Sequence, residues 1–227
     1  MSSQPTNDAK FDVYARDYAN LISQNVRLTG ESSDYFAEHK LQCLERLGMP
    51  ADTAVLDFGC GVGSLTAKLV TRFGSVHGFD PSQESLALAR SNNPGATFSS
   101  DLDSVPEGGF GLAVIANVLH HVPPADRPSV VRAIRSKLAP SGKLVVFEHN
   151  PWNPLTQRAV AICPFDDDAV LLWPREVKKL LRSCDFGAVR QDYILFFPRF
   201  LAPLRPLEPK LGWLMLGAQT MTVATRS

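Results

Sequence analysis

The chain has 227 residues, with 23 Lys and Arg side chains against 23 Asp and Glu, so its formal net charge is zero. A zero balance argues against a broad electrostatic surface for nucleic acid or for an anionic membrane, and we expect neither partner. Hydrophobic residues make up 44% of the sequence, which is typical of folded globular proteins, and no apolar run is long enough to span a membrane. The polar N-terminus and four widely spaced cysteines favour a cytoplasmic protein with reduced thiols.

Residues 1–50 are predicted to form a helical cap, because apolar residues recur at helical spacing over 11–22 and 33–47. From residue 53 onward, short apolar runs alternate with helical segments. The runs predicted to be strands are TAVLDF, SVHGFD, ATFSS, FGLAVIAN and KLVVFEH. Strands that alternate with helices are typical of a doubly wound α/β fold, in which helices cover both faces of a mainly parallel sheet.

The last third of the chain departs from this alternation. Residues 151–173 are irregular or partly helical, and Asp166–Asp168 either cap a helix over 169–173 or attract a cationic ligand. Pro174 begins a further helix, and the last two strands are predicted at VRQDYILFF and AQTMTVATR. The proline-rich stretch between those strands is too long for a tight hairpin loop. Nothing in the sequence marks a linker, so we expect one domain over 1–227.

A glycine-rich loop follows the first predicted strand, in the run VLDFGCGVG that begins at Val55. Loops at the carboxyl ends of parallel strands bind ligands in open α/β sheets, although a tight turn from strand to helix needs glycine as well. Asp80 ends the second predicted strand, where a carboxylate can accept both hydroxyls of a ribose. Asp57 would repel a pyrophosphate and attract an ammonium group. The two carboxylates together favour a ligand that has a ribose and a cationic head and lacks phosphate.

The motifs along residues 53–149 are VLDFGCGVG, HGFDPS, SSDLDSVP, FGLAVIANVLHHVP and LAPSGKLVVFEH. Their order and spacing resemble the class I S-adenosylmethionine-dependent methyltransferases, in particular the small-molecule (methyltransferase type 11/12-like) branch. The resemblance implies a Rossmann-like seven-stranded sheet in the order 3-2-1-4-5-7-6 with an antiparallel last strand. It also implies S-adenosylmethionine as cofactor and S-adenosylhomocysteine as product. Gly111 and Ser141 depart from the family pattern, at positions that we expect to be structural.

The resemblance also assigns cofactor contacts. It implies that Asp101 caps the adenine amino group and that Leu102 lies against the adenine ring. The full set of implied cofactor-binding residues is Tyr14, Tyr18, Asp57, Gly59, Cys60, Gly61, Gly63, Asp80, Pro81, Ser82, Asp101, Leu102, Ala116, Asn117 and His121. For Tyr14 and Tyr18, the apolar face of a helix is an equally good interpretation.

Candidate catalytic residues stand after the fourth and fifth predicted strands. His120 and His121 follow the fourth strand, and we expect their side chains to diverge, so that at most one faces the methyl acceptor. His121 is a candidate general base, because the pKa of an imidazole lies near physiological pH. Glu148 and His149, at the end of the fifth strand, are further candidates. The alternatives are a histidine that packs against the next helix and ordinary loop capping after the fifth strand.

Acceptor specificity is predicted to reside in a lid made of 150–173 and 196–215, because the cofactor uses the loops after the first three strands. Candidate acceptor contacts are His149, Asn150, Trp152, Phe165 and Trp213. The alternative is that both segments only cover the sheet. We expect no metal, because residues 116–119 lack the carboxylates of the metal-dependent branch and His39 with Cys43 makes only one ligand pair.

These expectations combine into one functional hypothesis. The chain would transfer a methyl group from S-adenosylmethionine to an O, N or C nucleophile of a small-molecule metabolite, as in secondary metabolism, without a metal and mainly by proximity and alignment. Residues 53–149 would form the cofactor-binding core and 150–227 the acceptor side, in a monomer or homodimer. The alternatives are an NAD(P)-linked Rossmann oxidoreductase, against which Asp57 argues, and a protein that binds S-adenosylmethionine without methylating.

Overall fold

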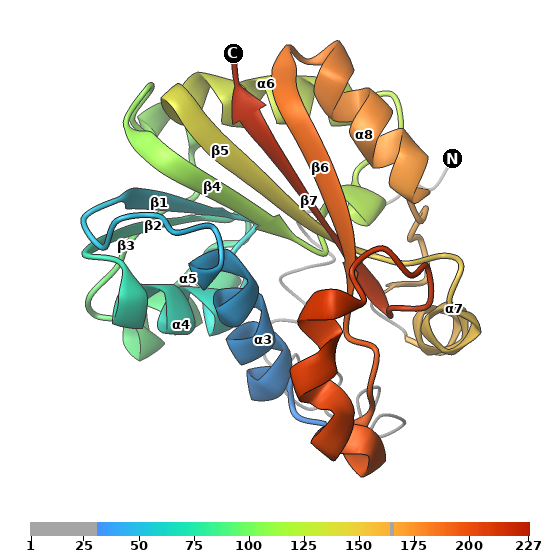
Figure 1. Cartoon of the computed structure of the whole chain (residues 1–227). Coiled ribbons are helices and arrows are strands. Elements are labelled where there is room, and N and C mark those ends of the chain that lie inside the picture. The colour runs from blue at the N-terminus through green and yellow to red at the C-terminus, as the bar shows by residue number, and fades with distance from the viewer. Residues whose placement is uncertain (1–30, 164–165) are drawn as a thin grey trace, which may run out of the picture.

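A computed structural model describes residues 31–163 and 166–227 of the chain (Figure 1). Within these residues, seven strands form one sheet in the order β3-β2-β1-β4-β5-β7-β6. The strands are β1 (Ala54–Phe58), β2 (Ser75–Phe79), β3 (Thr97–Ser99), β4 (Phe110–Ala116), β5 (Leu138–His149), β6 (Phe186–Ile194) and β7 (Gln219–Arg226). Strand β7 is antiparallel to β5 and β6, and the pairs from β3 to β5 are parallel. The expected strand order and the antiparallel last strand are confirmed.

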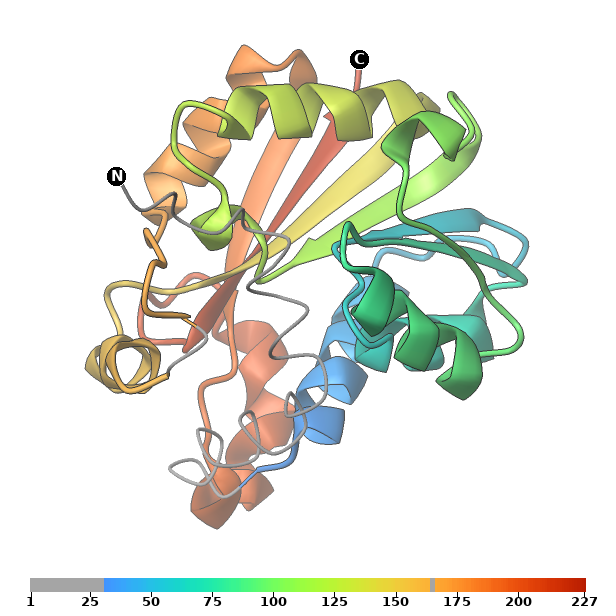
Figure 2. The ribbon, with the colours of Figure 1, turned by 180° about the vertical axis from the view of Figure 1, so that it is seen from behind.

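Helices cover both faces of this sheet. The helical elements are α3 (Ser33–Glu45), α4 (Ser64–Arg72), α5 (Gln83–Asn92), α6 (Arg127–Lys137), α7 (Pro154–Ala161) and α8 (Pro174–Ser183), with the 3₁₀ segments η1 (Leu102–Ser104), η2 (Leu119–His121) and η4 (Arg199–Lys210). Helices α3, α4 and α5 lie on one face, whereas α6 and α8 lie on the other (Figure 1 and Figure 2). In the described part of the chain, every helix is too short or too polar to cross a lipid bilayer. Tyr14 and Tyr18, with the helix predicted over 11–22, lie outside the described residues.

Successive side chains of the central strands point to opposite faces of the sheet, which divides the core into two parts. On β5, Val145 packs with the side chains of α3 and α4, whereas the next residue, Val146, packs with those of α6 and α8. Neighbouring strands repeat the pattern, since Val114 and Ile115 of β4 belong to opposite parts of the core. Strands that are apolar on both faces require helices on both faces, which is why this sequence forms a covered sheet.

The two departures from the family pattern are both accommodated by the backbone. Gly111 is the second residue of β4 and lies close to the turn before β1, where an added Cβ atom would lie 2.8 Å from Cγ2 of Thr53. Ser141 has a φ of 61° in the turn that lies within β5, and Gly142 follows it. Both positions are far along their strands from the carboxyl ends, so their role is structural.

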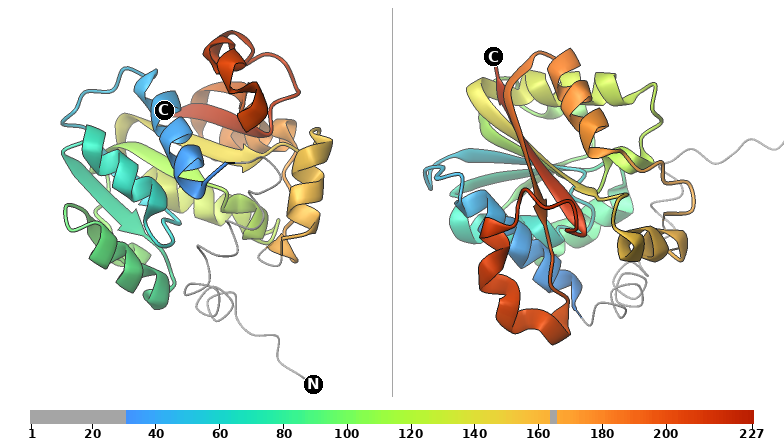
Figure 3. Two further views of the ribbon diagram at one scale, coloured as in Figure 1. Left: turned by 90° about the horizontal axis from the view of Figure 1, so that it is seen from below. Right: turned by 45° about the vertical axis from the view of Figure 1, so that its right-hand side comes forward.

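The proline-rich insertion forms η4, which lies beside α3 (Figure 3). Its prolines recur every three residues, which is the period of a 3₁₀ helix, so the missing N–H groups fall along one edge. Oε2 of Glu208 lies 3.7 Å from Nε2 of His39, and the guanidinium of Arg205 lies 4.2 Å from the centroid of the Tyr35 ring. The insertion is therefore attached to the helix that precedes β1.

The prediction of a helix over 169–173 is wrong, because this segment has no regular secondary structure. The backbone N–H of Val170 donates to the carbonyl oxygen of His120 at 2.8 Å. This N–H group therefore bonds to η2 and not to a carbonyl within a helix. Asp166–Asp168 consequently cap no helix at 169–173. Instead they lie on a loop that is held against η2.

Candidate active site

The glycine loop between β1 and α4 is built from left-handed backbone conformations. Gly59, Gly61 and Gly63 have φ values of 75°, 53° and 82°. A Cβ atom at Gly59 would lie 2.5 Å from Cγ2 of Val118, and one at Gly61 would face open space. Glycine at position 59 therefore lets the loop contact the residues that follow β4, and glycine at position 61 leaves room above the loop for a ligand.

The Asp80 carboxylate is fixed at the end of β2 by backbone donors. Its Oδ2 accepts from the N–H of Gly61 at 2.8 Å, and its Oδ1 accepts from the N–H of Ser82 at 3.0 Å. Ser82 is the N-cap residue of α5, and Pro81 precedes this helix. The two hydrogen bonds join the glycine loop to the end of β2 and orient both carboxylate oxygens.

Two buried charged side chains, Asp57 and Lys40, lie beneath the glycine loop. Asp57 is 2% exposed, accepts a hydrogen bond of 2.7 Å from Oγ1 of Thr66, and has a pKa that burial raises to about 6. Lys40, on α3, is also buried, and burial lowers the pKa of its ammonium group to about 8. Lys40 shares the helical spacing of Phe36 and Leu44, which places it on the inward face of the predicted helix. Thr66 was not singled out from the sequence.

At the far side of the loop, η1 and β4 supply further predicted residues. Oδ1 of Asp101 accepts from the N–H of Asp103 at 3.0 Å and caps η1, while Leu102 packs against the core on the α6 side. Asn117, with a φ of 57°, follows β4 directly, and its N–H donates to the carbonyl oxygen of Phe147 at 2.9 Å. Ala116 packs against the core on the α3 side.

Cys60 lies inside the loop and is 8% exposed. Burial raises the pKa of its thiol above the ordinary range, so the thiolate is disfavoured. A Cβ atom at Gly78 of β2 would lie 2.9 Å from the Cys60 sulfur atom. The side chain therefore packs beneath the loop, against β2.

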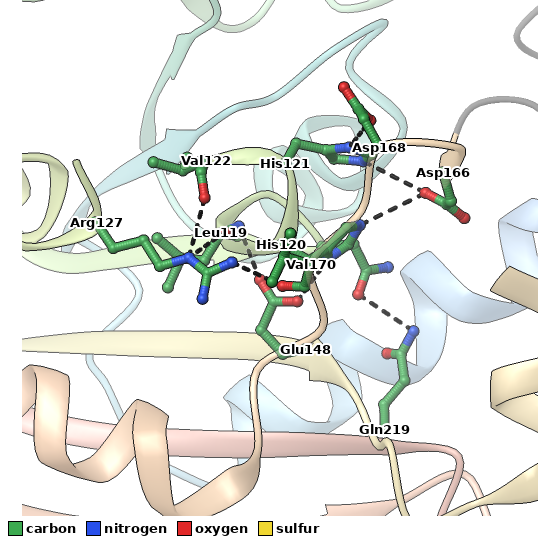
Figure 4. A network of polar contacts seen from close by, with 11 residues as sticks. Leu119, His120, His121, Val122, Arg127, Glu148, Asp166, Asp168, Val170 and Gln219 are labelled. Carbon is green, nitrogen blue, oxygen red and sulfur yellow. Dashed lines mark hydrogen bonds and ion pairs between the residues drawn. The ribbon is translucent and has the colours of Figure 1, made fainter. Parts of the chain in front are cut away.

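The turn after β4 places two histidines together. The ring centroids of His120 and His121 are 4.2 Å apart, and both Nε2 atoms approach Oδ1 of Asp166, at 3.6 Å and 3.4 Å (Figure 4). The expectation that the two side chains diverge is wrong, because a 3₁₀ turn and not an extended strand carries them. Asp166 then brings both imidazoles to one point from a distant part of the chain.

Glu148 lies beneath this histidine pair and is 1% exposed. Its Oε2 lies 2.6 Å from Nδ1 of His120, and its Oε1 accepts from the N–H of Leu119 at 2.8 Å. Burial alone would lower the pKa of His120, but the carboxylates of Glu148 and Asp166 outweigh it and raise the pKa to about 9. Burial alone would raise the pKa of Glu148, and His120 keeps it below its usual value. Glu148 therefore both caps η2 and pairs with a histidine.

The other two histidines of this region are neutral near pH 7. Burial, helped by the positive charge of His120, lowers the pKa of His121 to about 4 and that of His149 to about 4. The His149 ring lies with its centroid 5.0 Å from that of His120. Both are consequently weak bases that retain a lone pair at neutral pH.

The loop that carries Asp166 is clamped to η2 by main-chain contacts. One hydrogen bond runs from the N–H of Val170 to the carbonyl of His120 at 2.8 Å. Arg127 completes the clamp, because its Nη2 donates to the Val170 carbonyl at 2.7 Å and its Nε donates to the carbonyl of Val122 at 3.0 Å (Figure 4). Arg127 was missed at the sequence level, since a basic residue at the start of a helix is ordinarily exposed.

Asn150 ties the two predicted lid segments together. Its Nδ2 donates to the carbonyls of Met215 at 3.0 Å and Gly217 at 2.7 Å, and its Oδ1 accepts from the N–H of Trp152 at 3.1 Å. These bonds use both N–H groups of the side chain, so Asn150 positions the lid segments and has no donor left for an acceptor.

The aromatic residues of the lid lie toward its surface. Trp152 is 57% exposed and meets the edge of Trp173 at a centroid distance of 5.0 Å, and Trp213 is 75% exposed. Phe165 lies outside the described residues.

Comparisons with known proteins agree with this architecture. A family model described as a methyltransferase domain matches residues 55–142. The chain is 33% identical over 178 residues to an uncharacterized methyltransferase of Synechocystis, across 75% of this chain and 82% of that protein. It is 30% identical over 160 residues to a ubiquinone biosynthesis O-methyltransferase of Pseudomonas paraeruginosa, across 65% of this chain and 66% of that protein.

A solved structure shares the fold. Magnesium protoporphyrin IX methyltransferase from Synechocystis, determined with bound S-adenosylmethionine, matches with a TM-score of 0.67 at 15% identity, over 100% of both chains. The fold, the glycine loop and the relatives together define the class, and the chain belongs to the methyltransferase family. Its sheet order and motifs place it among the class I S-adenosylmethionine-dependent methyltransferases.

Proposed function

We propose that the protein transfers a methyl group from S-adenosylmethionine to an oxygen, nitrogen or carbon nucleophile of a small molecule. The observation that carries this proposal is the junction of the glycine loop with Asp80 at the carboxyl ends of β1 and β2. Two backbone N–H groups orient the Asp80 carboxylate, which would accept the ribose hydroxyls as a charged, bidentate partner. Open space beside Gly61 would receive the methionine part.

The other ends of the cofactor have candidate partners in the same region. The Asp57 carboxylate lies below the glycine loop and would attract the ammonium group of the methionine part. On the adenine side, Asp101 and Leu102 stand at η1, next to the end of β3. Asn117 and His121 follow β4 and would border the methyl group.

The chemistry demands little covalent participation from the protein. When bound, S-adenosylmethionine supplies a methyl group that is already strongly electrophilic. The residues of the chain would bind the acceptor in line with that group and exclude water, which is catalysis by proximity and alignment. His121 and His149 are weak bases here, so they would not carry the acceptor's proton as imidazolium, and His149 would orient the acceptor by accepting a hydrogen bond.

The acceptor side is assigned to the residues that follow the cofactor-binding core. Residues 53–149 would hold the cofactor, while 150–173 and 196–215 would form the walls around the acceptor, with residues 1–50 as an N-terminal cap. The link that Asn150 makes between these two segments supports this division. A small-molecule acceptor is also supported by the name of the Pseudomonas relative, which is an O-methyltransferase of ubiquinone biosynthesis.

A methyl-transfer screen tests this proposal. Purified protein is incubated with S-adenosylmethionine labelled in its methyl group and with panels of phenols, amines and carboxylic acids, and labelled products are separated from the donor. We expect label in a small-molecule product and an equal amount of S-adenosylhomocysteine. Binding of S-adenosylmethionine with no transfer to any panel, and none to an extract of metabolites, would favour the non-methylating alternative.

A further inference from the structure

The cluster around η2 contains a set of donor atoms that suits a metal ion. Among the residues that the structure describes, His120, His121 and Asp166 offer three ligand atoms that all lie within 4.8 Å of one another. Two of them are imidazole nitrogens and the third is a carboxylate oxygen, the donor types that bind zinc and related divalent transition metals. Both histidines are buried, and Asp166 is largely covered.

The separations between these atoms fit ligands of a common ion better than hydrogen bonds. Oδ1 of Asp166 lies 3.6 Å from Nε2 of His120 and 3.4 Å from Nε2 of His121. Hydrogen bonds between nitrogen and oxygen are about 2.7–3.2 Å long. Bonds of about 2.0–2.1 Å to a tetrahedral zinc ion place neighbouring ligand atoms about 3.4 Å apart.

The surroundings of His120 are those of a metal ligand. Its Nδ1 faces Oε2 of Glu148 at 2.6 Å, which leaves Nε2 directed at Asp166. A ligating histidine usually gives its second ring nitrogen to a carboxylate in this way, which fixes the ring and the tautomer. Glu148 is itself held by the N–H of Leu119 at 2.8 Å, so the orienting carboxylate is also fixed.

The third ligand is positioned independently of the first two. Asp166 lies on a loop that the Val170 N–H and the Arg127 guanidinium fasten to η2. These main-chain contacts bring Oδ1 of the Asp166 carboxylate to 3.6 Å and 3.4 Å from the Nε2 atoms of the two imidazoles (Figure 4). Because both sides of the site are held by separate contacts, the ligand atoms are preorganised.

We propose that His120, His121 and Asp166 bind a divalent transition metal ion such as zinc, with Glu148 orienting His120. This proposal replaces the expectation of a metal-free site, which rested on residues 116–119 and on the single ligand pair of His39 with Cys43. Three protein ligands leave a further coordination position for water or substrate. If the proposed function holds, that position would take a hydroxyl oxygen of the acceptor and favour its deprotonated form, with the proton released to solvent.

Metal binding is measured directly on the chelator-treated full-length protein. Zn²⁺ binding is followed by titration calorimetry and by elemental analysis after gel filtration, and Co²⁺ binding by its visible absorption. We expect one ion per chain, and little response to Mg²⁺, which prefers oxygen ligands. His121→Ala and Asp166→Asn should each weaken Zn²⁺ binding at least tenfold, and Glu148→Gln by about tenfold to a hundredfold.

Two matched variants serve as controls. Asp167→Asn makes the same charge change at the next residue of the loop, and His77→Ala removes a histidine from β2; both should keep wild-type metal affinity. Absence of Zn²⁺ and Co²⁺ binding, or binding unchanged in His121→Ala and Asp166→Asn, would overturn the proposal. S-adenosylmethionine affinity, measured on the same samples, should persist in Asp166→Asn and in the two control variants, so failure of the metal site is distinguishable from failure of the proposed function.

Discussion

Nδ1 of His120 lies 2.6 Å from Oε2 of Glu148, and both side chains are 1% exposed. Removal of one partner from a buried ion pair leaves an uncompensated charge, which costs about 3–5 kcal/mol. We therefore expect Glu148→Ala to lower the free energy of unfolding by that amount, measured by urea denaturation with a chelator present. Glu148→Gln, which keeps an acceptor for Nδ1, should lose less. Equal losses in the two variants would show that the charge of Glu148 is unimportant to stability.

The Asp80 carboxylate should determine cofactor affinity. Asp80→Ala removes the acceptor of two proposed hydrogen bonds from the ribose and should weaken S-adenosylmethionine binding by about 1.5–3 kcal/mol. Calorimetry measures the change, and Asp52→Asn, at an exposed position before β1, is the charge control. An unaltered dissociation constant in Asp80→Ala would remove Asp80 from the cofactor site.

Gly59 should tolerate no side chain. A Cβ atom there combines a φ of 75° with a 2.5 Å contact to Cγ2 of Val118. Gly48→Ala has a similar φ of 65° and open space, so it isolates the cost of the backbone conformation, about 1–2 kcal/mol. Gly59→Ala should lose more stability than Gly48→Ala in thermal or urea unfolding, and Val118→Ala should recover part of the difference. Equal losses in the two alanine variants would argue that the loop can move away from Val118.

His39 should make stability depend on pH in a defined window. Burial, and then the charges of Lys40, Arg46 and Arg205, lower its pKa in the folded protein to about 4, while Glu208 faces it from η4. Below about pH 6.5 the unfolded chain therefore binds a proton that the folded chain refuses, so stability falls as pH falls from 6.5 toward 4. Between pH 7.5 and 5 the wild type should lose about 2 kcal/mol more than His39→Gln. Parallel pH profiles for the two proteins would contradict this assignment.

The lid should act on the acceptor and leave the cofactor unaffected. Trp152→Ala should impair methyl transfer, through a raised KM for the acceptor, while S-adenosylmethionine affinity stays within about twofold, or about 0.5 kcal/mol. Leu88→Ala, at a partly exposed apolar position on α5, is the control and should behave as the wild type. A parallel loss of cofactor affinity and turnover in Trp152→Ala would mean that the segment only covers the sheet.

Much of this fold follows from local patterns. Val145 and Val146 pack in opposite parts of the core, and this alternation is visible in neighbouring residues of the sequence. The glycines after β1 are also close together in the sequence. The sheet and the cofactor loop could therefore be predicted. The contact between Asp166 and His121 could not be predicted, because it depends on main-chain hydrogen bonds to a loop without regular structure. Such hydrogen bonds produce no periodic pattern in the sequence.

The most direct test of the central claim is calorimetry of the wild-type protein with S-adenosylmethionine and, separately, with NADH. The carboxylates of Asp57 and Asp80, on either side of the glycine loop, should admit a ribose with a cationic head and repel a pyrophosphate. We predict saturable binding of one S-adenosylmethionine per chain and no measurable binding of NADH. Tight binding of NADH with none of S-adenosylmethionine would contradict the account.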